Sequence, residues 1–111
     1  MTPDEARQKL EEFRVLIDDV DRRIVALLNE RTRVVENIGR VKRQTQMPIY
    51  EPKREDQVFA NISASNGGPL TGEAVRRIFE RIIDEMRTIQ RLRMEKGDGP
   101  AAVPEPGEKT C

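Results

Sequence analysis

The chain has 111 residues, with 36% hydrophobic and 36% charged side chains, and its 20 lysine and arginine residues balance 20 aspartate and glutamate residues. The length suits a single domain, and the composition excludes collagen-like, disulfide-rich and membrane-spanning proteins. A net charge of zero also removes the usual electrostatic argument for binding nucleic acid.

The chain has no histidine, and its one cysteine is the last residue, Cys111. These facts exclude histidine-based general bases, histidine metal ligands and cysteine-cluster zinc sites within the chain. Cys111 has no partner for an intrachain disulfide and lies in a polar tail, so a catalytic thiol is not expected. The first five residues contain two acids and no apolar run. No signal peptide is therefore expected, and a cytoplasmic location is predicted.

The first part of the chain carries a long apolar seam. Its members follow one another at alternating spacings of three and four: Leu10, Phe13, Ile17, Val20, Ile24, Leu27, Arg31, Val34, Ile38 and Val41. This heptad spacing is typical of a helix that packs along its whole length. Thr2 and Pro3 suit a helix start, and the next proline is Pro48. The pattern predicts one helix from about residue 3 to about residue 45, roughly 63 Å long.

The length of this helix predicts the assembly. A compact chain of this size has a radius of gyration of only about 13 Å, so one protomer cannot wrap so long a rod. We therefore predict an obligate, intertwined homodimer in which a second chain covers the seam.

Two shorter helices are predicted after the long helix. Pro48 and Pro52 end the long helix, and a short helix of about 52–64 follows. The cluster 66–69 reads as a turn, after which Thr71 caps a third helix that runs to about residue 95. Residues 97–111, rich in proline and glycine, are predicted to be disordered. The expected fold is all-α, with three helices in the order long–short–medium, a domain of 1–96 and a tail of 97–111.

Polar residues on the apolar stripes are the candidates for function. Arg31 occupies a seam position, where a guanidinium needs an anionic partner; a ligand and a nearby glutamate that sets the helix register are equally good partners. Lys42 lies eleven residues further on, which returns it to within about 20° of the same face. Gln90 lies four residues after Met86 on the third stripe, where a bond to backbone and a bond to a ligand are both open.

Three other charged residues are weaker candidates for the functional site. Arg14 lies about 100° around the helix from Arg31, so it cannot easily share a pocket with Arg31 of its own chain, although it could reach the pocket of an antiparallel partner. Arg54 and Glu55 open the short helix and, on their own, are ordinary first-turn charges. Taken together, the residues predict a cationic pocket that binds an anion or stabilises developing charge without a nucleophile.

With these residues in this order along the sequence, the chain resembles the all-helical, prokaryotic type of chorismate mutase. The spacing of Arg14, Arg31, Lys42 and the Arg54-Glu55 pair, followed later by Gln90, carries the resemblance, which covers about residues 8–93. The resembling segments are 13–21, 27–31, 38–42, 48–55 and 82–90. The resemblance implies an isomerase that rearranges chorismate to prephenate for phenylalanine and tyrosine biosynthesis, with no cofactor and no metal.

The resemblance also implies a role for each matching residue. Arg31 and the Arg14 of the other chain would grip the substrate carboxylates, while Lys42 and Gln90 would donate to the ether oxygen. Glu55 would accept from the ring hydroxyl with Glu51 nearby, and Arg54 would add positive potential and help to place Glu55. Two residues depart from the family pattern. Glu51 stands where many relatives have aspartate. Met86 stands where some relatives have a small hydroxyl residue near a substrate carboxylate. The implied catalytic residues are Arg31, Lys42 and Gln90, and the substrate-binding residues are Arg14, Arg31, Lys42, Glu51, Arg54, Glu55, Met86 and Gln90.

Two other functions fit parts of the sequence. An isochorismate-pyruvate lyase on the same fold would use the same arginines, lysine and glutamine, although Arg54, Glu55 and Glu51 favour the mutase. A non-catalytic helical dimerisation module would need the seam but neither Arg31 nor Gln90 on its apolar stripes. The expected partners are a small-molecule substrate and a second copy with shared active sites, without nucleic acid or membrane, and a partner enzyme could regulate activity.

Overall fold

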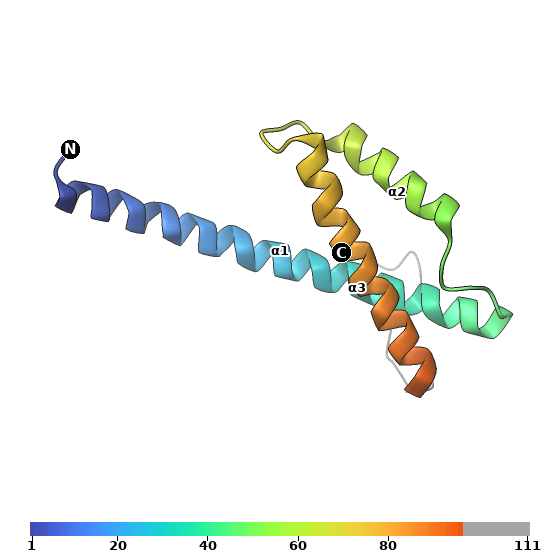
Figure 1. Ribbon diagram of the computed structural model, residues 1–111. Coiled ribbons are helices and arrows are strands. Elements are labelled where there is room, and N and C mark those ends of the chain that lie inside the picture. Colours follow the sequence, from blue (N-terminus) through green and yellow to red (C-terminus); the bar gives the residue numbers. More distant parts are fainter. Residues whose placement is uncertain (97–111) are drawn as a thin grey trace.

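The computed structural model describes residues 1–96, so the predicted tail of 97–111, including Cys111, lies outside the described residues. The described chain forms three helices and no strand: α1 (Pro3–Thr45), α2 (Pro52–Ser65) and α3 (Gly72–Lys96) (Figure 1). The predicted all-α class and the long–short–medium order are confirmed, and each helix begins and ends close to its predicted position.

Local chemistry explains both ends of α1. Thr2 caps its start, because the Thr2 Oγ1 accepts a hydrogen bond of 3.1 Å from the backbone N of Glu5, and acidic residues in the first turn suit the helix dipole. The helix stops at Gln46, whose φ of 58° is left-handed. The N of Met47 then donates to the carbonyl of Lys42 at 2.7 Å, which satisfies a carbonyl of the last turn. Within residues 1–96, no helix is both long and apolar enough to span a membrane.

The two shorter helices also begin where the sequence predicts. Pro52 lies in the first turn of α2, where a missing N–H costs nothing. Thr71 caps α3, because its Oγ1 accepts a hydrogen bond of 3.1 Å from the N of Ala74. In the turn between them, the side chain of Asn66 accepts from the N of Gly68 at 3.0 Å, and Gly68 has a φ of 79° that favours glycine.

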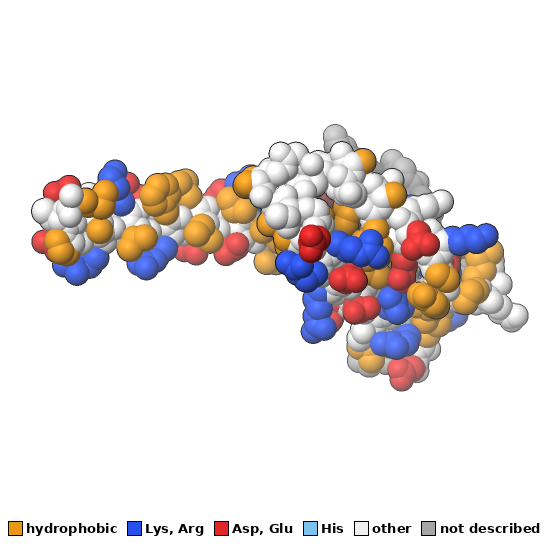
Figure 2. All heavy atoms as spheres, turned by 45° about the horizontal axis from the view of Figure 1, so that its top comes forward, with side chains coloured by type: hydrophobic (Ala, Val, Ile, Leu, Met, Phe, Trp, Pro, Cys, Tyr) orange, Lys and Arg blue, Asp and Glu red, His pale blue; other side chains and the backbone are white. Residues whose placement is uncertain are grey.

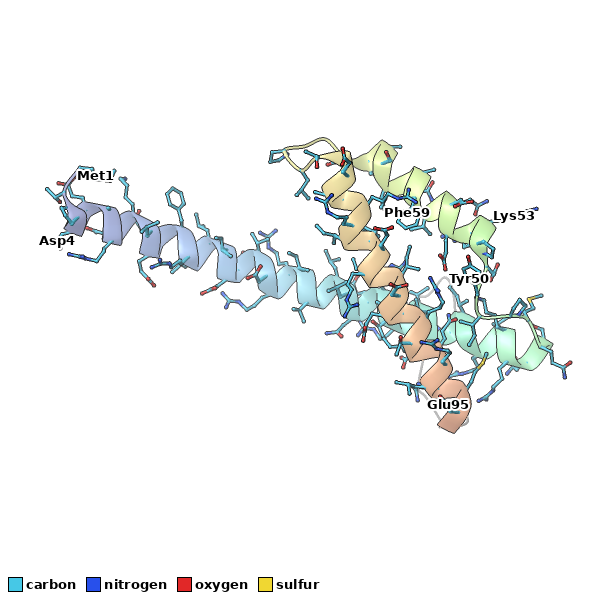
Figure 3. The ribbon with its side chains drawn as sticks, viewed as in Figure 1. Met1, Asp4, Tyr50, Lys53, Phe59 and Glu95 are labelled. Carbon is cyan, nitrogen blue, oxygen red and sulfur yellow. The ribbon has the colours of Figure 1, made fainter. Side chains whose placement is uncertain are left out.

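Helix α3 holds the three helices together. It crosses the C-terminal half of α1 and also packs against α2, whereas α1 and α2 have no direct packing in the described chain (Figure 1). The buried apolar residues are Val35 of α1 and Val75, Ile83 and Met86 of α3. Phe59 projects from α2 toward α3 (Figure 3), and the guanidinium of Arg76 lies 4.1 Å from the centre of its ring. This arrangement leaves room for a cavity between α1 and α2.

The predicted seam of α1 lies open to solvent in the single chain. The N-terminal half of α1 extends away from the other helices (Figure 1), and apolar side chains are exposed along it (Figure 2). Phe13 and Leu27 are 60% and 61% exposed, and none of the described side chains is completely buried. The exposed apolar seam residues are Leu10, Phe13, Ile17, Val20, Ile24, Leu27, Val34, Ile38 and Val41. One chain therefore covers a different face of α1, the face that carries Val35.

Candidate active site

A cavity of about 420 Å³ lies between the three helices, within the usual size range for small-ligand pockets. It is lined by Arg31, Val34, Val35, Ile38, Lys42, Ile49, Glu51, Arg54, Glu55, Val58, Ile83, Met86, Arg87 and Gln90. Figure 2 shows basic and acidic side chains gathered where the helices meet. Seven of the eight residues expected from the sequence line this one cavity, and Arg14 does not.

Lys42 is a buried ammonium held by two oxygen atoms. The residue is 8% exposed, and its Nζ donates to the Ile49 carbonyl at 2.9 Å and lies 2.9 Å from Oε1 of Glu51. A charge buried to this degree needs such partners. Because an ammonium carries three N–H donors, these two contacts leave one donor for a ligand in the cavity.

Arg31 and Arg54 line the cavity without a carboxylate beside them. Burial lowers the pKa of the half-buried Arg31 guanidinium below its usual value, and the nearby charge of Arg54 lowers it further. The exposed Arg54 donates a hydrogen bond to Gln57 at 3.4 Å. Neither guanidinium forms an ion pair within residues 1–96, so the register-setting glutamate that could have satisfied Arg31 is not found there. Two adjacent, uncompensated guanidiniums form a site for an anion.

Glu55 is held by Arg87, a residue that the sequence analysis did not select. The Arg87 Nη2 lies 3.1 Å from Oε2 of Glu55 and 3.3 Å from Oδ1 of Asp84, and the guanidinium lies over the Tyr50 ring at 5.0 Å. Arg54, which the resemblance implies would help to place Glu55, donates a hydrogen bond to Gln57. The sequence does contain a signal for Arg87. It lies four residues after Ile83 and therefore on the apolar stripe of α3, just as Arg31 lies on the apolar seam of α1.

Gln90 is buried, at 8% exposure, and is oriented by α1. Its Nε2 donates to the carbonyl of Val35 at 3.3 Å, which is the backbone bond that the sequence left open. A Cβ atom added to Gly39 would lie 3.3 Å from Cγ of Gln90, so glycine allows α3 to approach α1 closely here. Since an amide has two N–H donors, the Val35 bond leaves one N–H for a ligand.

Met86 and Arg14 complete the predicted set. Met86 is buried and gives the cavity an apolar wall. It is the residue that departs from the small hydroxyl residue of some relatives. Its Sδ lies 3.6 Å from the Oγ1 of Thr32. Arg14 is exposed on the projecting half of α1 and lies 17 residues, or roughly 26 Å along the helix, before Arg31. This position agrees with the prediction that Arg14 cannot reach the cavity of its own chain.

The charges of the cavity favour a ligand with two negative groups. Lys42 pairs with Glu51 and Arg87 pairs with Glu55, whereas Arg31 and Arg54 have no carboxylate partner among the described residues. Residues 1–96 hold no cluster of histidine, cysteine or acidic residues that could bind a metal ion. The donors and the shape of the cavity can therefore hold a dianion and stabilise charge that develops on it.

Comparison with known proteins identifies the family. Residues 13–91 match the family described as chorismate mutase type II, and the chain belongs to this family. It is 28% identical to a chorismate mutase of Methanocaldococcus jannaschii, over 80% of this chain and 91% of that protein. It is 35% identical to the solved chorismate mutase of Thermus thermophilus (form II), with a TM-score of 0.73 over 75% of this chain and 94% of that chain.

Longer relatives carry a second activity in their names. The chain is 34% identical to a bifunctional chorismate mutase/prephenate dehydratase of Aquifex aeolicus, over 86% of this chain and 28% of that protein. The chain thus spans about a quarter of the length of such bifunctional relatives. The resemblance found in the sequence and the all-helical fold that it implied are confirmed by these comparisons.

Proposed function

We propose that the protein is a chorismate mutase, an isomerase that rearranges chorismate to prephenate in phenylalanine and tyrosine biosynthesis. The observation that carries this proposal is the pair of unpartnered guanidiniums, Arg31 and Arg54, in a cavity lined by further donors. Chorismate is a dicarboxylate, so its two charges match the two cations that the cavity leaves uncompensated. Family membership over residues 13–91 supports the same conclusion.

The reaction suits a site without a nucleophile. It is unimolecular: the ether C–O bond breaks while a new C–C bond forms, and no group leaves the molecule. The protein must hold the substrate in its compact reactive conformer and stabilise negative charge that develops on the ether oxygen. We assign that stabilisation to the remaining N–H donors of Lys42 and Gln90, whose other bonds to Ile49, Glu51 and Val35 already fix their directions.

The remaining residues bind the substrate. In our proposal Arg31 and the Arg14 of a second chain grip the carboxylates, and Arg54 adds positive potential. Glu55 accepts from the ring hydroxyl with Glu51 nearby, and Met86 supplies an apolar wall. Glu55 is suited to accept because the Arg87 guanidinium, 3.1 Å away, holds its carboxylate in place.

We also propose that the active unit is an intertwined homodimer. The apolar seam of α1 is exposed from Leu10 to Val41, and such a patch is rarely left uncovered. A second copy laid along it would cover the seam and could bring its Arg14 to the cavity. Sedimentation tests this: a folded monomer at micromolar concentration would contradict the dimer and the shared site. A cytoplasmic location and a regulatory partner enzyme remain predictions from the sequence.

The test of the function is prephenate formation from chorismate by the purified chain. We expect Lys42→Met to lower kcat/KM by about 10²-fold or more, as for other preorganised donors. Lys53→Met is the matched control, because the exposed Lys53 side chain points away from α3 (Figure 3). Pyruvate release from isochorismate without prephenate from chorismate would instead identify a lyase, and neither activity would favour a dimerisation module.

A further inference from the structure

Arg87 contacts both Glu55, which lines the cavity, and Tyr50, which lies between the lining residues Ile49 and Glu51 in sequence. Its Nη2 lies 3.3 Å from Oε1 and 3.1 Å from Oε2 of Glu55, and the two side chains are only 32% and 22% exposed. The same guanidinium lies over the ring of Tyr50, in the segment that leads into α2. The Nε atom of Arg87 is buried and has no hydrogen-bond partner within the described chain. The contacts of this arginine with Glu55 and Tyr50 thus come from its terminal guanidinium nitrogens and its cationic face, and not from Nε.

A released Glu55 would compete with the substrate. The cavity also contains Arg31 and Arg54, which lack a carboxylate partner in the part of the chain that the structure describes. An ionised Glu55 that could rotate freely would be attracted to these guanidiniums. It would then occupy the charges that the substrate carboxylates need, and it would no longer face the ring hydroxyl.

We infer that Arg87 is a positioning residue that acts through Glu55. It holds this carboxylate in one orientation, away from Arg31 and Arg54, so that the anion site stays open. The inference rests on the proposed function and adds a residue to it, since Arg87 itself is not required to touch the substrate.

A double-mutant cycle separates this role from a structural one. Chorismate turnover is measured for the wild type, Arg87→Met, Glu55→Gln and the double variant. We expect Arg87→Met to raise KM and to lower kcat/KM about tenfold, which is less than the roughly 10²-fold loss that a 1 Å misplacement can cause. In the Glu55→Gln background, which has no carboxylate to release, the same substitution should change kcat/KM less than about twofold.

Two further variants control for folding. Arg76 also extends from α3 over an aromatic ring of α2, that of Phe59, but it does not line the cavity of about 420 Å³. Arg76→Met should therefore remove a contact between α3 and α2 and leave kcat/KM unchanged. Arg87→Lys keeps a cation near Glu55 and should recover most of the loss in KM. It also provides the comparison if Arg87→Met folds poorly.

The outcomes distinguish the inference from the function. A wild-type protein that forms no prephenate would overturn both. An active wild type whose Arg87→Met variant keeps its kcat/KM would overturn the inference alone. Equal losses in the two Glu55 backgrounds would also overturn it, because Arg87 would then act independently of Glu55.

Discussion

Glu51 stands at the position before the first turn of α2, yet its carboxylate lies 2.9 Å from the Nζ of Lys42 and makes no capping hydrogen bond. The Lys42 Nζ also donates to the carbonyl of Ile49. The last turn of α1 is thus tied to the segment that begins α2. Glu51 contributes to the orientation of the buried ammonium rather than to the stability of its own helix.

This relationship predicts that substitutions of Glu51 affect the free energy of unfolding and the catalytic activity to different degrees. Serine at the N-cap contributes about 0.5–2 kcal/mol relative to alanine, which offsets part of the cost of leaving the buried Lys42 ammonium without its carboxylate partner. Glu51→Ser should therefore lower the free energy of unfolding less than Glu51→Ala does, and it should lower kcat/KM because Lys42 loses an orienting partner. Thermal unfolding and prephenate formation measure the two effects.

Glu51→Ala is the matched control for the cap. It removes the same ion pair without supplying a capping hydroxyl, so it should show the same kinetic loss as Glu51→Ser and a lower melting temperature. A Glu51→Ser variant with wild-type kcat/KM would show that the Lys42–Glu51 contact has no part in catalysis.

Arg31 should oppose folding in the absence of substrate. Burial and the charge of Arg54 lower its pKa, which means that the folded chain disfavours the charged form. A lowered pKa of a base makes its protonation destabilising at every pH below that pKa, and an arginine is protonated throughout the neutral range. The destabilisation is therefore present at neutral pH and would be relieved only as the pH rises through the lowered pKa.

Arg31→Met should consequently raise the melting temperature of the substrate-free protein and lower kcat/KM by about 10²-fold or more. Arg33→Met, at an exposed position two residues away, should change neither quantity appreciably. An Arg31→Met protein that is clearly less stable than the wild type would mean that the guanidinium has an anionic partner in the free protein.

Gly39 should matter for catalysis more than for stability. A Cβ at this position would lie 3.3 Å from Cγ of Gln90, so Gly39→Ala must displace that side chain by a few tenths of an ångström. Alanine also favours a helix interior by up to about 1 kcal/mol over glycine, which offsets the crowding. We expect a near-normal melting temperature and a several-fold lower kcat, which is less than the roughly 10²-fold loss that a full 1 Å misplacement can cause.

Gly72→Ala provides the comparison for Gly39. A Cβ on Gly72 would meet no atom within 4 Å, so this substitution changes backbone freedom without crowding a neighbour. It should leave kcat at the wild-type value. Equal kinetic effects at the two glycines would rule out displacement of Gln90 as the cause.

Much of this architecture could be predicted from the sequence because it depends on local chemistry. The caps at Thr2 and Thr71 and the breaks at Pro48 and Pro52 determine the helix ends. Helical geometry alone placed Arg31 and Lys42 on one face, and the structure brings them to the same cavity.

The contacts between elements could not be predicted in the same way. The bond from Gln90 to Val35 and the pair of Glu55 with Arg87 depend on where α3 crosses α1 and α2. Sequence spacing within one helix carries no information on that crossing. The position of Arg87 on the apolar stripe of α3 therefore does not show that Glu55 of α2 lies beside it.

A shared site in the proposed dimer predicts that two inactive variants restore activity when mixed. If each site takes Arg14 from one chain and Arg31 from the other, a dimer of Arg14→Met with Arg31→Met contains one intact site. Random pairing after refolding a one-to-one mixture should recover about a quarter of the wild-type activity. A mixture of Arg31→Met with Lys42→Met should recover none, because both residues line the cavity of their own chain. Failure of the first mixture, with mixed dimers present, would exclude Arg14 from the partner's site.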